Sequence, residues 1–144
     1  MLVNQILKGK SDDGVATIAP GSTVADAAEQ LSARKIGALI VSSDGKKALG
    51  IISERDIVRA LGQSGAPVLT KKVDELMTGK LVTCNRTETS DAILEKMSVG
   101  RFRHMPVLEG DEMIGLISIG DVVKARLAEL AMEKDALEGM IKGF

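Results

Sequence analysis

The sequence predicts a mixed α/β fold of the α+β kind, in which two β-α-β-β-α units pack about a pseudo-twofold axis. The first observation behind this prediction is a ten-residue motif that spans 50–59 and returns at 115–124. Each copy reads glycine, two apolar residues, serine, two variable residues, aspartate, two apolar residues and a basic residue. A short apolar run that reaches a serine and continues with helical periodicity predicts a strand that turns directly into a helix.

The second observation is that the elements before this motif also occur twice, 66 residues apart. Extended segments begin at Thr17 and Thr83, and Pro20 favours extended geometry for the residue before it. Apolar residues at helical spacing follow in 24–31 and again after Thr89, where Thr23 and Thr89 are suitable helix caps. Apolar segments 36–41 and 102–107 then predict two buried strands.

The turns between the paired strands explain why the offset falls from 66 to 65 residues. The first turn contains Asp44-Gly45, a frequent hairpin dipeptide, and the second, at 109–111, is one residue shorter. A register kept across several blocks predicts a fused pair of repeats. We expect a first repeat over 1–67, a second over 68–130 and a helical extension over 131–144, with a linker at 62–67.

The last helix is expected to run from Asp121 to about Ile141, roughly 30 Å at 1.5 Å per residue. This is longer than one small repeat needs to cover its sheet. The surplus is either a dimer or partner surface, or a segment that folds back as core.

Composition excludes several classes of function. The chain has 144 residues, 44% of them hydrophobic, with 19 basic and 20 acidic side chains and a formal net charge of −1. A general nucleic-acid binder would carry a basic surplus, and the absence of Trp and Tyr removes most base-stacking platforms. A single cysteine, no evident signal peptide and no membrane-length apolar run predict a cytoplasmic protein.

The doubled strand-to-helix motif resembles that of cystathionine-β-synthase (CBS) domains, and the tandem resembles a Bateman module of the stand-alone bacterial kind. The likeness covers roughly residues 1–130. Arg103-His104-Met105-Pro106-Val107 also resembles the His-x-Pro-Val strand of the family, whereas 37–41 in the first half lacks both His and Pro.

This resemblance implies a regulatory module that binds adenosine-containing ligands such as AMP, ADP, ATP or NAD(H) in two clefts between the repeats. It implies no catalytic cofactor, and it implies a homodimer of such pairs that regulates a protein partner. Because the chain carries no other domain, we expect it to act in trans on that partner. The different residues at 35–38 and 101–104 predict unequal clefts.

The two aspartates of the motif are the leading site candidates. By the resemblance, Asp56 and Asp121 accept hydrogen bonds from ribose hydroxyls, a role that carboxylates also have in dinucleotide folds. Ser-x-x-Asp is equally the signature of a helix capping box, and this explanation stays open. Ser53 and Ser118 could meet a phosphate at the helix start, or act as caps alone.

The remaining candidates surround these turns. The basic ones, Lys35, Arg55, Arg101 and Arg103 with His104, suit a polyphosphate, although a solvated surface role is the alternative for each. The resemblance places the region of Thr17 and Thr83 at the adenine end. The other predicted ligand-binding residues are Gly37, Ala38, Ile52, Cys84, Met105, Pro106 and Ile117, for which strand packing is the competing explanation.

Three functions remain to be compared. A sensing module is expected to bind nucleotide and shift the packing of its repeats. The alternative is a ligand-free structural or interaction protein that works through its dimer surface and C-terminal helix. An enzyme is not expected, because no nucleophile–base pair, no Cys/His metal set and no phosphate loop is present in the sequence.

Overall fold

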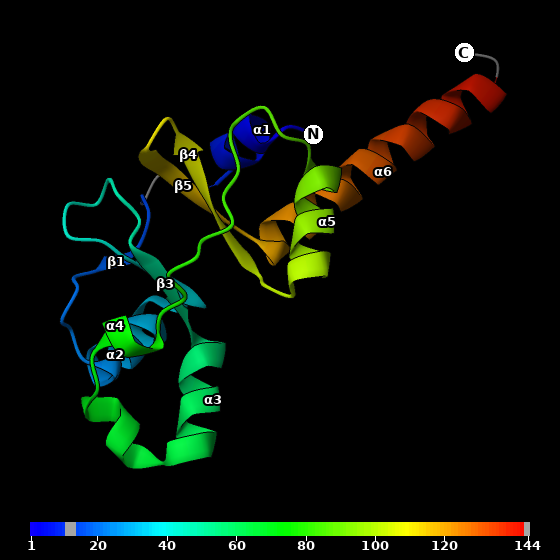
Figure 1. The fold of residues 1–144 in the computed structure, drawn as a ribbon. Helices are drawn as coiled ribbons and strands as arrows, with labels where there is room; N and C mark the ends of the chain where they lie inside the picture. Colours follow the sequence, from blue (N-terminus) through cyan, green and yellow to red (C-terminus); the bar gives the residue numbers. More distant parts are fainter. Residues whose placement is uncertain (11–13, 143–144) are drawn as a thin grey trace.

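Two halves of similar architecture make up the molecule, and a long C-terminal helix projects from the second half (Figure 1). The computed structural model describes residues 1–10 and 14–142. The first half contains β1 (Thr17–Ile18), α2 (Val24–Arg34), β2 (Ala38–Val41), β3 (Gly50–Ser53), α3 (Glu54–Ser64), the 3-10 helix η1 (Ala66–Thr70) and α4 (Val73–Leu76). The second contains α5 (Ser90–Gly100), β4 (His104–Glu109), β5 (Glu112–Ser118) and α6 (Ile119–Ile141), together with the N-terminal α1 (Val3–Lys8).

The sheets of the two halves have the same register. In the first half, β1 pairs in parallel with β2 (Ile18 with Val41), and β2 pairs antiparallel with β3. In the second half β4 and β5 form an antiparallel pair, and a single parallel bridge joins Cys84 to Val107. These two residues lie 66 positions after Ile18 and Val41. The predicted α+β fold of two repeats is therefore confirmed.

The short helices pack on the half that does not contain the rest of their own repeat. Val3 and Ile6 of α1 pack in the core of the second half, while Val68 of η1 and Val73 of α4 pack in the core of the first. Matching backbone hydrogen bonds hold them, since Val3 N donates to Glu88 O at 2.9 Å and Val73 N donates to Ser22 O at 2.8 Å. Each half thus completes its core with a helix from outside its own repeat.

This exchange bears on the predicted division of the chain. Segment 62–67, expected as a linker, comprises the end of α3 and the start of η1, whose Val68 is buried in the first core. The expected linker is therefore mostly helical rather than irregular, because its residues end α3 and begin η1. The repeats 1–67 and 68–130 and the extension 131–144 stay a prediction.

Helix α6 spans 23 residues and begins two residues before the predicted start at Asp121, while its end at Ile141 agrees with the prediction. Its first turns pack through Val122 and Ala125 on the core of the second half. Beyond Arg126 its large apolar side chains are exposed, and they are Leu127, Leu130, Met132, Leu137, Met140 and Ile141. The distal part of α6 does not fold back as core; it extends away from the body (Figure 1).

Candidate functional site

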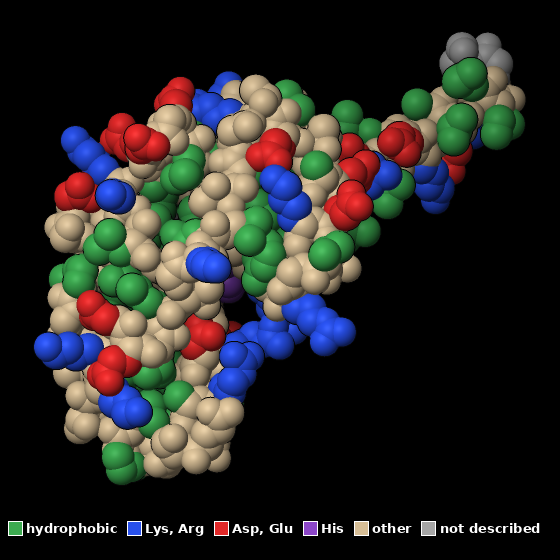
Figure 2. Space-filling model, viewed as in Figure 1, with side chains coloured by type: hydrophobic (Ala, Val, Ile, Leu, Met, Phe, Trp, Pro, Cys, Tyr) green, Lys and Arg blue, Asp and Glu red, His purple; other side chains and the backbone are tan. Residues whose placement is uncertain are grey.

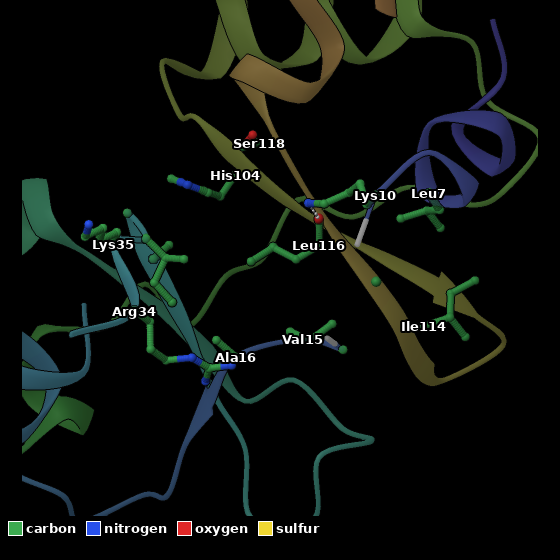
Figure 3. Close-up of a pocket in the computed structure, with 15 residues that line it drawn as sticks. Leu7, Lys10, Val15, Ala16, Arg34, Lys35, His104, Ile114, Leu116 and Ser118 are labelled. Atoms are coloured by element: carbon green, nitrogen blue, oxygen red, sulfur yellow. Dashed lines mark hydrogen bonds between the residues drawn. The ribbon is translucent and has the colours of Figure 1, made fainter. Parts of the chain in front are cut away.

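Two clefts lie between the halves. The first cleft is lined by 14–16 and 34–38 of the first half and by Leu7, Lys10, His104, 114–116 and Ser118 from the second-half side (Figure 3). The second cleft is lined by Ile51, 53–56 and Arg59 of the first half, by Thr78, and by 80–82, 100–104 and Pro106. Gly37 and His104 border both clefts.

The clefts are related by the repeat. Segments 14–16 and 34–38 of the first cleft correspond, 66 residues on, to 80–82 and 100–104 of the second. In each cleft the junction of a helix with a strand from one half faces the Ser-x-x-Asp turn of the other half. Both clefts therefore need both halves.

At these junctions a basic residue ends the helix in a left-handed conformation. Lys35 closes α2 with φ 53° and Arg101 closes α5 with φ 56°. They are the only non-glycine residues with positive φ in the described part of the chain. Such conformations are uncommon for residues with a Cβ, and here they place two equivalent cations in the linings of the two clefts.

The serine turn of the second cleft is a formed capping box. Asp56 Oδ2 accepts from the backbone N–H of Ser53 at 2.8 Å and from its hydroxyl at 3.0 Å, while Ser53 Oγ accepts from Asp56 N at 3.3 Å. The other oxygen, Oδ1, lies 3.9 Å from Arg59. The capping explanation is thus correct for one carboxylate oxygen, and the other oxygen remains for a hydroxyl donor.

The turn of the first cleft differs through Lys10. The Nζ of Lys10 donates to Asp121 Oδ2 and to the carbonyl of Leu116, each at 2.7 Å. The same Oδ2 accepts from Ser118 N at 2.9 Å. Burial raises the pKa of Asp121, but the hydrogen bonds from Lys10 and Ser118 outweigh it and hold that pKa below its usual value. A ligand that approaches this carboxylate meets a lysine already bound to it.

His104 lines both clefts and lies near the charged residues of both serine turns. Burial lowers its pKa, and the positive charges of Lys10 and Arg103 lower it further against the opposing carboxylates of Asp121 and Glu54. The imidazole is therefore neutral at neutral pH in the folded protein. An anion bound in either cleft would favour its protonation.

The shift of His104 predicts a pH-dependent stability. Because its folded pKa is below 6.5, the unfolded chain binds the proton first as the pH falls. The contribution of His104 is therefore fully present above pH 6.5 and is lost as the pH falls toward the folded pKa. We expect His104→Gln to flatten this part of the stability curve, measured by urea unfolding from pH 7.5 to 5. Identical slopes for variant and wild type would contradict the prediction.

Eleven of the eighteen predicted ligand-binding residues line a cleft. Those of the first cleft are Lys35, Gly37, Ala38, His104 and Ser118. Those of the second are Gly37, Ser53, Arg55, Asp56, Arg101, Arg103, His104 and Pro106. Asp121 is placed beside the first cleft through Lys10. Ligand contact by each of these residues stays a prediction.

The structure corrects several of the others by one or two positions along a strand. Ile52, Met105 and Ile117 are fully buried in the cores, since alternate residues of a strand face opposite sides. Their neighbours Ile51 and Leu116 line the clefts instead.

The same displacement applies to the extended pieces. The clefts are lined by Val15 and Ala16, and by Leu81 and Val82, rather than by Thr17 and Thr83. Alternation along a strand does not select these positions, because both residues of each adjacent pair line the same cleft.

Cys84 lies in the second core and lines neither cleft. Burial, together with the charge of Glu88, raises the pKa of the thiol to about 11, so it stays protonated. Its interpretation as a small buried hydrophobe fits this placement.

Lys10, Lys80 and Arg59 were missed as cleft residues. Lys10 belongs to no repeated motif, and its approach to Asp121 arises only because α1 packs on the other half.

In 1–10 and 14–142 there is no group of three or more His, Cys, Asp or Glu side chains that could hold a metal ion. No helix in the same ranges is both long enough and apolar enough to cross a membrane.

Two interleaved halves with a cleft on each side define a tandem-repeat module. Comparison with known families confirms this class, since the CBS domain model matches residues 11–63 and 73–128. The chain belongs to the CBS domain family and carries two copies of the domain. It is 36% identical over 141 residues to the "CBS domain-containing protein CBSX3, mitochondrial" of Arabidopsis thaliana, covering 94% of this chain and 68% of that protein.

Solved structures share the fold. The CBS-domain containing protein ATU1752 from Agrobacterium tumefaciens is 44% identical, with a TM-score of 0.83, over 88% of this chain and 99% of that one. The CBS domain pair of protein MJ0100, solved in complex with 5′-methylthioadenosine and S-adenosyl-L-methionine, is 25% identical with a TM-score of 0.76, over 90% and 98%.

Proposed function

We propose that this chain is a regulatory module that senses adenosine-containing ligands, with AMP, ADP, ATP and NAD(H) as candidates, in the two clefts between its CBS repeats. The observation that carries the proposal is the repeated Ser-x-x-Asp turn, since each half presents one such turn to one of the two clefts. In the second cleft, one oxygen of Asp56 lies outside the capping hydrogen bonds. A carboxylate in this position can accept from the vicinal hydroxyls of a ribose.

The similarity to a CBS pair that binds adenosyl ligands supports the same chemistry. The cations that line the clefts supply attraction for phosphate or for another anionic group. No residue in the clefts is assigned a catalytic role. A cytoplasmic location, a homodimer of the pair and a regulated protein partner in trans belong to the same proposal.

The regulatory step is expected to come from the interleaved construction of the halves. Because each cleft is built from both halves, a ligand that binds one relative arrangement better than another shifts the population toward it. The distal part of α6 is rigidly continuous with the Ser118 turn, since the helix begins directly after that residue. A shift at the first cleft would therefore move the exposed end of α6.

A thermal-shift experiment tests the binding proposal. The protein would be melted with AMP, ADP, ATP, NAD, NADH and S-adenosylmethionine, and with GMP and GTP as controls for the base. A ligand at a hundredfold its Kd adds about 2.7 kcal/mol to the unfolding free energy, a rise in Tm on the order of 5–10 °C. We expect such a rise with at least one adenosyl ligand. No rise with any of them at millimolar concentration would overturn the proposal.

The alternative is a ligand-free interaction protein, and the exposed apolar residues of distal α6 favour it. Leu127 and Leu137 are 62% and 59% exposed and share the distal part of the helix with four further exposed large apolar residues, an accumulation that is typical of interaction surfaces. This alternative predicts no nucleotide-dependent rise in Tm. It also predicts that removing 131–144 changes the assembly state while leaving the unfolding free energy of the body nearly unchanged.

A further inference from the structure

Cations gather in the second cleft. Five of them line it, namely Arg55, Arg59, Lys80, Arg101 and Arg103, against the two carboxylates of Glu54 and Asp56. Figure 2 shows Lys and Arg side chains along a hollow between the two halves. Grouped like charges repel each other and raise the local positive potential, so this cleft attracts multiply charged anions.

Few of these cations are neutralised by the protein. Arg59 lies 3.9 Å from Asp56, at the limit of a salt bridge. Within residues 1–10 and 14–142, the other four have no carboxylate oxygen within 4 Å. Their charge is therefore available to a ligand.

The additional cations come from three positions at which the halves differ, and at one of them Lys80 corresponds to Gly14. Arg103 corresponds to Gly37, and Arg55 corresponds to Gly120. Equivalent hydrogen bonds confirm this register, since Glu54 N donates to Gly37 O at 2.9 Å and Ile119 N donates to Arg103 O at 2.8 Å. The second cleft thus has two arginines at backbone positions where the first cleft has glycines.

The first cleft also has fewer cations that lack a salt-bridge partner. Its cations are Lys10, Arg34 and Lys35, and Lys10 is already paired with Asp121 at 2.7 Å. Two cations are left, and neither corresponds to Arg55 or Arg103. At the position equivalent to Arg103, Gly37 has no side chain that could contact a phosphate in this cleft.

We infer that the second cleft takes a nucleoside di- or triphosphate, whereas the first takes an adenosyl ligand with at most one phosphate. This inference rests on the proposed adenosine binding and adds the phosphate class of each cleft. Arg55 and Arg103, which form planar bidentate contacts with phosphate, determine the difference.

Calorimetric titration of the full chain with ATP, AMP and inorganic tripolyphosphate tests the inference. At low salt and without added magnesium, we expect one ATP site per chain that binds at least tenfold more tightly than AMP binds there, with tripolyphosphate competing. Arg55→Gln/Arg103→Gln is expected to weaken ATP at least tenfold while AMP changes less than threefold.

A matched control separates local contacts from overall charge. Arg34→Gln/Lys35→Gln removes an equal number of positive charges, two, from the first cleft and should leave the tight ATP site unchanged. If both double variants lose ATP equally, the inference is overturned. Equal ATP and AMP affinities in the wild type would also overturn it, although adenosine binding would then stand.

A reciprocal variant tests the first cleft. A Cβ at Gly120 would meet only Ser118 Oγ, at 3.6 Å, so a side chain can start there without displacing backbone. Gly120→Arg is expected to strengthen ATP binding in the first cleft at least threefold, and no change would count against the role of this position. Failure of every adenosyl ligand to bind, AMP included, would overturn the proposed function itself.

Discussion

Asp56→Ala is expected to weaken adenine nucleotide binding in the second cleft by about a hundredfold. Two hydrogen bonds from ribose hydroxyls to a carboxylate are worth roughly 1.5–3 kcal/mol each, and each 1.4 kcal/mol is a factor of ten in Kd. The side chain is 20% exposed, so water replaces the lost contacts only in part. Calorimetric titration with the ligand identified by thermal shift gives the change in Kd directly.

Asp26→Ala is the matched control for this variant. Asp26 stands in the capping box of α2 and accepts from Thr23 N at 3.3 Å, as Asp56 does from Ser53, but it lines neither cleft. Both variants lose the side-chain half of a capping box, which is expected to lower the free energy of unfolding by about 0.5–2 kcal/mol. Only Asp56→Ala should lose the ligand. Similar Kd values for the two variants would show that Asp56 is a cap alone.

Asp121→Ala completes the comparison. It should weaken the ligand of the first cleft and leave the second largely unchanged, because His104 and Gly37 are the residues shared by both. Its effect is expected to be of similar size to that of Asp56→Ala, since Lys10 and Ser118 N both bind Oδ2 and leave the other oxygen outside these hydrogen bonds, as in Asp56. Equal loss at both clefts would contradict independent sites.

Gly50→Ala is expected to destabilise the protein by about 1–3 kcal/mol, the usual range for overpacking. A Cβ there would overlap the Met77 side chain and lie 3.1 Å from the carbonyl of Thr78. That segment is tied to β3 by hydrogen bonds between Ile51 and Thr78, at 2.9 and 3.1 Å. Because both residues line the second cleft, nucleotide binding there should weaken as well. Urea unfolding measures the loss of stability.

Gly62→Ala serves as the control for the glycine. Gly62 lies inside α3 with no atom within 4 Å of its Cβ position, so alanine favours the helix by up to about 1 kcal/mol. The two substitutions should therefore move the unfolding midpoint in opposite directions. A Gly50→Ala variant as stable as wild type would mean that the segment at Met77 and Thr78 repacks without cost.

The repeats could be recognised from the sequence because their signals are local. A glycine, an apolar pair and a Ser-x-x-Asp turn specify a strand and a capped helix without distant contacts, and both copies form as expected at Ser53 and Ser118. The length of α6 was predictable for the same reason. The order of the elements along the chain was also predictable. So were eleven cleft residues, most of which lie on these turns or at the helix–strand junctions.

Side-chain direction was harder to predict within a strand. A shift of one residue moves a side chain from the cleft to the core, so Ile52 and Ile117 were chosen where Ile51 and Leu116 line the clefts. Both members of each pair are apolar, and composition alone could not separate them.

By itself the sequence determined the two repeats, their register and the capped Ser-x-x-Asp turns, because each depends on residues close together in the chain. Only the tertiary structure decided which groups share a cleft. Lys10 reaches Asp121 across 111 positions because α1 packs on the second half, and His104 borders both clefts because the halves pack against each other. Such contacts result from the packing of apolar faces, and the sequence of an apolar face does not indicate which polar groups its packing brings together.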